Sequence, residues 1–418
     1  MQTIIIENAT VLDVVQGKLL PDQRIVIEGQ RFARVTPMRA TEASLTASGE
    51  VYDARGMTVM PGLCDAHVHV TTWTSNLPER EQASPAYSTV RTIEVLEGML
   101  MRGFTTVRDQ AGADYGLAQV VQDGYLKGPR ILFCGSALSS TGGHGDLRGR
   151  EAQGVDGAGR LSLFRLCDGV AEMRRTCRDE IRKGAHHIKL MISGGIFSPT
   201  DRLTNDQFAE EEIRAAVEEA GMADIYCTGH AYTTRAVNRA LHFGVRSLEH
   251  CNLIDESSVE LFLQHKAFMT PTLSVYAAMV RESQSMNFPV EMQEKLHRVQ
   301  DKGLQALELA SRSGVKLVYG TDLVGKLHAH QLDEFKLRSK VQPAIDIIRS
   351  ATCNAAELFN EVGQIGVLAA GARADLLVVD GNPLSDLGCL QAPDRCLKAI
   401  MKDGKFYKNA LLSLRKQG

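Results

Sequence analysis

The sequence has few aromatic residues, no strong charge of either sign and no long apolar run. Phe, Trp and Tyr make up 6% of the 418 residues, and 47 basic side chains nearly balance 50 acidic ones. The balanced charge argues against a nucleic-acid partner, because such proteins present a broad basic surface. No segment approaches the roughly 18 consecutive apolar residues of a membrane helix, and the first residues lack the pattern of a secretion signal. We therefore expect a soluble, cytoplasmic protein with a small-molecule substrate and no membrane partner.

The nine cysteines are scattered, and they include no Cys-x-x-Cys pair. Closely spaced pairs would indicate a disulfide framework or a zinc ribbon. Their absence predicts reduced thiols that are buried as small apolar side chains. The hydrophobic content of 44% supports a sizeable core.

Both ends of the chain have the pattern of short β-strands. Residues 1–58 contain alternating apolar runs broken by Gly, Pro and Asn, and residues 363–418 contain two more such runs around an Asp-Gly-Asn-Pro turn. We expect the two ends to form one small β-sandwich domain. Residues 59–362 are then a second domain.

In this second domain, eight short apolar runs alternate with helical patterns. Residues 88–103, 205–221 and 298–314 are examples of these helices, and each closes on a glycine suited to a helix C-terminus. Eight strand and helix units predict an α/β fold, the (β/α)8 TIM barrel. Residues 136–166 are too long for an ordinary connection and form a candidate lid. The eight expected strands are residues 62–70, 104–110, 130–135, 186–193, 225–231, 246–251, 267–273 and 316–322.

Polar residues gather where these expected strands end, which is where such barrels place their catalytic groups. His67 and His69 end the first run, and side chains two apart on a strand share a face, so both imidazoles can bind one metal. His230, His250 and Asp322 end the fifth, sixth and eighth runs. Each has a plain structural explanation, as a surface or rim histidine or as a helix cap. Their joint occurrence predicts a metal site.

Lys189 lies inside the apolar fourth run, IKLMISGG. Burying an ammonium without a partner costs several kcal/mol or leaves the amine neutral. A neutral amine is nucleophilic and can add carbon dioxide to form a carbamate, whose two oxygens can bridge metals about 3.5–4 Å apart. We expect Ile188 and Leu190 to face the helices while Lys189 points to the barrel axis.

Taken together, these motifs resemble the amidohydrolase superfamily from about residue 3 to residue 410. PGLCDAHVH is similar to the opening strand of that family, IKLMISGG to its fourth strand, GHA and LEHCNLID to its fifth and sixth, and YGTD to its eighth. The resemblance implies two divalent metals, which we expect to be Zn²⁺, although these ligands also suit Mn²⁺, Co²⁺ or Fe²⁺. The implied ligands are His67, His69 and Asp322 for the more buried metal, His230 and His250 for the more exposed one, and carbamylated Lys189 as the bridge.

Longer stretches, including TGGHGD and YGTDLVGKLHAHQLDEF, resemble the metal-dependent dipeptidases, the branch that includes prolidase and Xaa-Arg carboxypeptidases. This resemblance implies hydrolysis of an amide bond in a dipeptide or N-acyl amino acid. A metal-bridged hydroxide attacks the carbonyl, and Asp322 passes its proton to the leaving nitrogen. Tyr232 and His144 are implied to stabilise the oxyanion or hold the substrate, although Tyr232 packing on the barrel rim fits nearly as well.

The leaving group is less directly predicted. Its carboxylate requires a cation, for which Arg148 and Arg235 are candidates, and the apolar loops favour a neutral or proline-like leaving group.

One alternative function is that of a mononuclear deaminase or cyclic-amide hydrolase similar to imidazolonepropionase, a group that usually lacks the bridging lysine. Another is a non-enzymatic assembly scaffold, a class that loses metal ligands. We expect the chain to form a homo-oligomer.

Overall fold

The structure is a computed structural model that describes residues 2–39, 49–149, 151, 162–198, 200–286 and 290–415. The chain divides into two compact units. The terminal unit comprises Met1–Asp65, Glu97–Thr106 and Gln342–Gly418, and the central unit comprises Ala66–Leu96 and Val107–Val341. The domain boundaries expected at residues 58 and 362 stay predictions.

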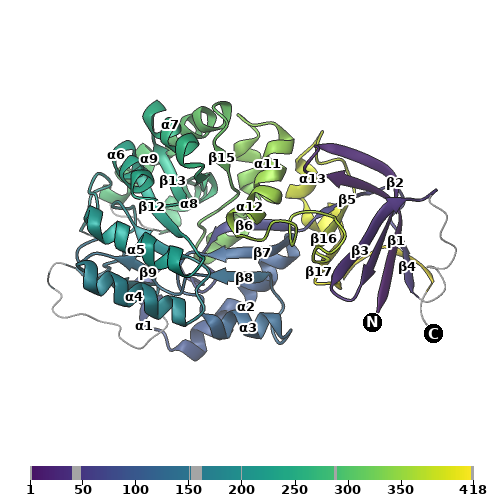
Figure 1. The fold of residues 1–418 in the computed structure, drawn as a ribbon, viewed down its shortest axis with the longest axis horizontal. Coiled ribbons are helices and arrows are strands. Elements are labelled where there is room, and N and C mark those ends of the chain that lie inside the picture. The colour runs from purple at the N-terminus through teal and green to yellow at the C-terminus, as the bar shows by residue number, and fades with distance from the viewer. Residues whose placement is uncertain are drawn as a thin grey trace. The chain divides into compact units, whose positions relative to one another are not determined.

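In the terminal unit, the two ends of the chain share one β-sheet (Figure 1). Strand β16 (Leu376–Val379) pairs antiparallel with β5 (Thr58–Pro61), which lies beside β1 (Thr3–Asp13). The strand order is β18-β17-β16-β5-β1-β2-β3, and β4 pairs with β1 and β19. The prediction that both ends build one sheet structure is confirmed. The other strands are β2 (Lys18–Glu28), β3 (Arg31–Pro37), β4 (Glu50–Asp53), β17 (Leu397–Lys402), β18 (Lys405–Asn409) and β19 (Leu412–Arg415).

Side chains alternate between the two faces of β1, as a period of two requires. Ile4 and Ile6 belong to one buried apolar cluster, whereas Ile5 packs with Val26 and Val51 in another. Both faces of this strand are therefore covered. The strand pairs make one nine-stranded sheet, and the β-sandwich stays a prediction.

All eight strands expected in the middle of the chain are present. Two further short strands, β9 (Ala137–Ser139) and β10 (Phe164–Leu166), lie in the segment expected to be a lid. They pair with each other in parallel, so part of that segment forms the edge of a sheet. Residues 150 and 152–161 of the segment lie outside the described residues. The eight expected strands are β6 (Leu63–Val68), β7 (Phe104–Asp109), β8 (Arg130–Phe133), β11 (Ile188–Met191), β12 (Cys227–Thr233), β13 (Ser247–Leu253), β14 (Phe268–Thr270) and β15 (Lys316–Leu317).

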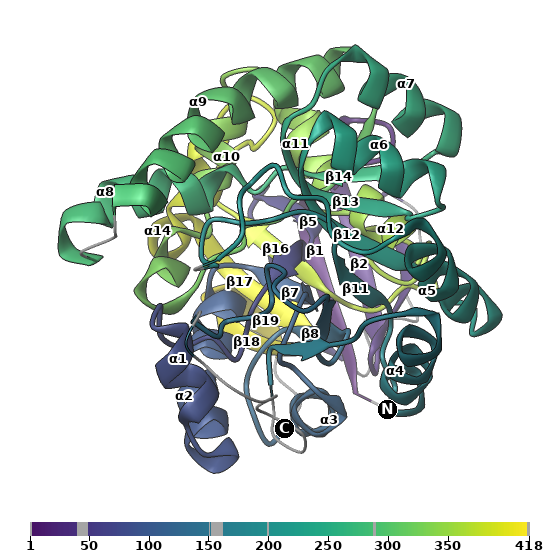
Figure 2. The same ribbon diagram turned by 90° about the vertical axis from the view of Figure 1, so that its left-hand side faces the viewer.

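These strands form two sheets, of order β6-β7-β8 and β10-β9-β11-β12-β13-β14-β15. Helices α4 to α7 and α9 lie around the outside of β11 to β14 (Figure 2). An α/β fold is therefore confirmed, while the closed barrel stays a prediction. The helices are α1 (Leu77–Gln82), α2 (Pro85–Met101), α3 (Tyr115–Gln122), α4 (Val170–Arg182), α5 (Glu210–Met222), α6 (Thr234–His242), α7 (Glu256–His265), α8 (Leu273–Met286), α9 (Val290–Arg312), α10 (Asp333–Arg338), α11 (Ala344–Ser350), α12 (Cys353–Leu358), α13 (Gly388–Gln391) and α14 (Pro393–Cys396), with a 3₁₀ helix η2 (Gly325–His330).

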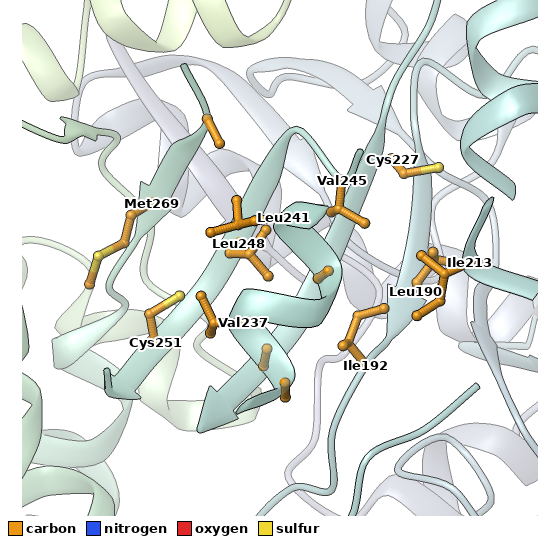
Figure 3. Close-up of a cluster of buried hydrophobic side chains, with 14 of the residues drawn as sticks. Leu190, Ile192, Ile213, Cys227, Val237, Leu241, Val245, Leu248, Cys251 and Met269 are labelled. Atoms are coloured by element: carbon orange, nitrogen blue, oxygen red, sulfur yellow. The ribbon is translucent and has the colours of Figure 1, made fainter. Parts of the chain in front are cut away.

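The core of the central unit separates apolar from polar side chains along β11. Leu190 and Ile192 point into a buried cluster with Val237 and Leu248 (Figure 3). Lys189 lines a pocket instead, as the alternation of the strand predicts. The cysteines are all free and eight of the nine are buried, which confirms their expected role as small core residues. Across the described segments, none of the helices has both the length and the apolar character of a membrane span.

Candidate metal centre

The strand ends of the central unit bring the predicted metal ligands to one pocket. The pocket is lined by histidines, a lysine and a carboxylate together with apolar side chains, a mixture typical of small-molecule sites. We call the six ligand candidates that line it the metal cup. They are His67, His69, Lys189, His230, His250 and Asp322.

Asp322 is the point on which the imidazoles converge. The Nε2 atoms of His67 and His69 lie 3.3 Å and 3.0 Å from the same carboxylate oxygen, Oδ1. Potential ligand atoms of His67, His250 and Asp322 all lie within 4.8 Å of one another. The ring of His230 is 4.6 Å from that of His250, so the fourth imidazole adjoins the same group.

The protonation of these groups suits a divalent metal. Burial alone would raise the pKa of Asp322, but the charge of His67 and hydrogen bonds with His67 and His69 hold it well below its usual value. Burial lowers the pKa values of His230 and His250 well below the ordinary value, so both rings are neutral. His230 and His250, as neutral imidazoles beside an ionised carboxylate, are donors of the kind that divalent transition metals require.

Lys189 is the polar group of the cup that lacks a partner. Its side chain is 1% exposed, and its Nζ makes no hydrogen bond among the described residues. Burial lowers its pKa from 10.5 to about 8. A buried amine without a partner is costly, so its position in the cup indicates that a bound group compensates it.

A second polar cluster, the basal layer, holds His67 in place. Glu249 Oε2 accepts a hydrogen bond from His67 Nδ1 at 2.8 Å, which leaves Nε2 of this ring free for a metal. Glu249 Oε1 lies 2.8 Å from Arg108 Nη2, and both side chains are completely buried. The basal layer comprises Arg108, Tyr226, Thr228, Ser247 and Glu249, linked by hydrogen bonds to Arg108 or Glu249.

Glu249 and Arg108 were not among the residues predicted from the sequence. Both are charged residues inside buried strands, the same signal that singled out Lys189. Glu249 also precedes His250 directly. A search for every charge in an apolar strand would have found them.

Glycines let the backbone approach the cup closely. A Cβ on Gly320 would meet the side chain of Thr270 and lie 2.9 Å from Cβ of His67. A Cβ on Gly195, at the end of the IKLMISGG stretch, would overlap the ring of His144. Larger residues at either position would displace a histidine of the pocket.

Tyr232 and His144, which were expected to contact the substrate, both line the pocket. The ring of Tyr232 stacks on that of His250 at 5.2 Å between centroids, and the ring of His144 stacks on that of His230 at 4.3 Å. His144 Nδ1 is 3.0 Å from Ser198 Oγ. Burial lowers the pKa of His144 to about 4, so its ring is neutral near pH 7.

The two arginines proposed for the substrate carboxylate are not brought to the pocket. Arg148 forms a bidentate pair with Asp146, with both N–O distances at 2.7 Å. Arg235 donates to Asp206 and to the carbonyl of Thr204. Neither lines the pocket. We therefore assign the carboxylate to neither arginine.

Several known proteins are similar to this chain in sequence and in fold. Residues 58–407 match the Amidohydrolase family. A solved structure of a prolidase complexed with N-methylphosphonate-L-proline is 42% identical, with a TM-score of 0.94 over 98% of this chain and 100% of that one. A Xaa-Pro dipeptidase with bound methionine is 26% identical, with a TM-score of 0.86 over 98% of this chain and 100% of that one. Ochratoxinase from Aspergillus niger is 32% identical over 369 residues, which are 84% of this chain and 75% of the fungal protein. The resemblance found in the sequence is confirmed, and the chain belongs to the amidohydrolase family as a metal-dependent hydrolase of carbon–nitrogen bonds.

Proposed function

We propose that the protein is a binuclear metallohydrolase that cleaves the amide bond of dipeptides or N-acyl amino acids, with Xaa-Pro dipeptides as the first substrates to test. The observation that carries this proposal is the convergence of four histidines, Asp322 and the unpartnered Nζ of Lys189 on one pocket. A single metal would leave the buried lysine unexplained. Two metals would account for it, because the carbamate of Lys189 would be one of their ligands.

In this proposal His67, His69 and Asp322 hold one metal, and His230 and His250 hold the other. Zn²⁺ suits these ligands. Lys189 Nζ adds to the carbon of carbon dioxide and releases a proton, which gives a carbamate with one negative charge. The lowered pKa of Lys189, about 8, supports this step, because a larger fraction of the amine is neutral near pH 7.

Bound metals would polarise the substrate carbonyl and make water acidic enough to act as a nucleophile. The residues of the chain do the rest. Asp322 is ionised and accepts the proton of the attacking water at its carboxylate, then returns it to the leaving nitrogen. The Tyr232 hydroxyl donates a hydrogen bond to the carbonyl oxygen, and neutral His144 holds the substrate beside it.

The walls of the pocket favour apolar substrates. Half of the residues that line it are aliphatic, phenylalanine or methionine side chains. Among the lining residues that the structure describes, Lys189 is the one Lys or Arg. The names of the prolidase, Xaa-Pro dipeptidase and ochratoxinase relatives support an amide substrate of this kind. The apolar lining residues are Leu77, Leu147, Leu163, Phe164, Met191, Ile196, Phe197, Val275, Met279 and Val324.

We also propose that the strands of the central unit close into the (β/α)8 barrel. Hydrogen bonds from Ala66 N to Tyr319 O (2.7 Å) and from Asp322 N to His67 O (2.7 Å) support closure between the first and eighth strands. The bond from His186 N to Phe133 O (2.8 Å) supports a junction between the third and fourth. Such a ring accounts for the meeting of all six cup residues at one end.

The test is a panel of dipeptides and N-acyl amino acids varied on both sides of the amide, assayed with Zn²⁺ and bicarbonate. We expect turnover of substrates with apolar side chains, two metals per chain by elemental analysis, and a carbamate mass increment on the peptide that contains Lys189. Asp322→Asn is the inactive control. Activity with one metal per chain, unaffected by Lys189→Ala, would replace the binuclear proposal with the mononuclear alternative.

A further inference from the structure

A chain of four polar side chains runs from the cup residue His250 to Tyr232. His250 Nδ1 lies 2.7 Å from Thr272 Oγ1. Thr272 Oγ1 is 3.5 Å from the hydroxyl of Tyr276, at the outer limit of a hydrogen bond, and Tyr276 in turn donates to the Tyr232 hydroxyl at 3.3 Å. The chain thus joins the imidazole of a metal ligand candidate to a phenol that lines the pocket.

All four residues are buried, and Thr272 has an unusual backbone. The exposed fractions are between 0% and 3%. Thr272 has a φ of +47°, a left-handed conformation that costs energy for a β-branched residue. Thr272 follows β14 and precedes α8, the helix that carries Tyr276. Strain of this kind is retained where the surrounding structure requires a specific side-chain position.

If Nε2 of His250 held a metal, the direction of these hydrogen bonds would be determined. When Nε2 binds a metal, the ring proton stays on Nδ1. Asp322 Oδ2 is 4.0 Å from Nδ1, too far for a hydrogen bond, so the proton is donated to Thr272. Thr272 must then donate to Tyr276, and Tyr276 to Tyr232. The oxygen of Tyr232 accepts this last bond, so its own proton is free to point into the pocket.

We propose that Thr272 and Tyr276 are positioning residues that orient the Tyr232 hydroxyl as the hydrogen-bond donor to the substrate carbonyl. This inference rests on the proposed amide hydrolysis and names a device of the same site. Two phenols in series give the donor a direction, because each accepts one bond and donates the next. Loss of the middle phenol would leave the Tyr232 hydroxyl free to rotate away from the substrate.

The test is a double-mutant cycle of Tyr232→Phe and Tyr276→Phe. We expect Tyr276→Phe to lower kcat about tenfold, with KM within about twofold, and Tyr232→Phe to lower kcat by about 10²-fold. Because Tyr276 acts through Tyr232, the double variant should be within about twofold of Tyr232→Phe alone. Multiplied losses would overturn the proposal, as would an unchanged kcat in Tyr276→Phe. Tyr52→Phe, in the terminal unit, is the matched control with unchanged kinetics.

Binding provides a second readout. N-methylphosphonate-L-proline carries a tetrahedral oxyanion, whereas L-proline does not. We expect calorimetry to show about tenfold weaker binding of the phosphonate by Tyr276→Phe and unchanged binding of L-proline. Equal loss for both compounds would indicate a general packing defect and would contradict the proposal.

A third readout requires no substrate. Zn²⁺ added to chelator-treated protein should change the near-ultraviolet circular dichroism of the tyrosines, and Thr272→Val should lose most of this change. Thr92→Val, which removes another buried hydroxyl, should keep it. An undiminished response in Thr272→Val would refute the chain. If the wild type neither cleaves the amide panel nor binds the phosphonate, the proposed function fails, and the tyrosine response still tests the chain.

Discussion

The metal cup and the basal layer are both buried and charged, but they differ in how their charges are compensated. In the basal layer, Arg108 and Glu249 form a direct ion pair, and Ser247 donates to Glu249 at 2.9 Å. In the cup, the Nζ of Lys189 has no hydrogen bond among the described residues. A satisfied buried network stabilises one conformation. An unsatisfied group that lines a pocket is a candidate for contact with a ligand.

The two clusters meet at His67. Its Nδ1 belongs to the basal layer through Glu249, and its Nε2 belongs to the cup through Asp322. The basal layer therefore orients His67, which is a ligand candidate of the metal cup. Changes in the cup should alter chemistry at small cost in stability, whereas changes in the basal layer should alter both.

The largest expected effect is that of Asp322→Asn in the cup. The amide cannot accept the proton of the attacking water, so kcat should fall by about 10³-fold or more, while the metal content changes little. Steady-state kinetics and elemental analysis measure the two quantities. Asp346→Asn, at a half-exposed carboxylate of α11, is the control. Retained turnover in Asp322→Asn would remove Asp322 as the proton carrier.

Glu249→Gln should have the next largest effect, because it breaks the basal layer. Arg108 is left buried without its counter-charge, which costs about 3–5 kcal/mol of unfolding free energy. The loss of the acceptor for His67 Nδ1 should also weaken metal binding about 10- to 100-fold. Urea unfolding and competition with a metal chelator measure these effects.

Glu180→Gln is the matched control for this change. Glu180 is also buried, but its partners Arg165 and Lys183 are 28% and 44% exposed. Water can therefore solvate them when the carboxylate is lost, and the variant should lose less stability and no metal affinity. Equal losses in the two variants would mean that the basal layer is no more than another salt bridge.

Lys189→Met should change stability in the opposite direction. A methionine of similar length removes the unpartnered amine from the metal-free cup, so unfolding free energy should rise by about 1–3 kcal/mol. The same change should reduce the metal content of protein loaded with Zn²⁺ and bicarbonate. A loss of stability in metal-free Lys189→Met would show that Lys189 already has a partner in the folded chain.

A further expected effect is a dependence of the unfolding free energy on pH. The pKa of Lys189 is about 8 in the folded chain, against an ordinary value of 10.5. Between these values Lys189 binds more protons in the unfolded chain, so its contribution to the unfolding free energy of metal-free protein should rise with pH, by on the order of 3 kcal/mol in total. Urea unfolding at several pH values should show this rise as the difference between the wild type and Lys189→Met, because the buried cysteines, whose pKa values are raised by burial, titrate alike in both proteins. Parallel curves for the two proteins would contradict it.

Much of the cup could be predicted because its residues carry local signals. His67 and His69 are two apart on a strand, and Lys189 interrupts an apolar run, so alternation alone indicates which side chains share a face. The partners of these residues could not be predicted in the same way. Glu249 is 182 positions from His67 and 141 from Arg108, and no periodicity relates them.

The substrate contacts show the same limit. Arg148 was a reasonable candidate for a carboxylate, but Asp146, two residues away, occupies its guanidinium. Tyr276 was not considered, because it lies in a helix and its hydrogen bond to the Tyr232 hydroxyl joins residues 44 positions apart in the chain. Strands β9 and β10 were missed because each has three residues, too few for an alternating pattern.

By itself, the sequence determined the eight expected strands, the sharing of one sheet by both ends and the six cup residues through local patterns along the chain, and the family through the resemblance of its motifs. The tertiary structure decided which groups are compensated. It paired Arg108 with Glu249, left Lys189 without a hydrogen bond among the described residues and aligned four side chains between His250 and Tyr232. Hydrogen bonds and ion pairs depend on distances of a few ångströms between residues far apart in the chain, and folding alone sets those distances.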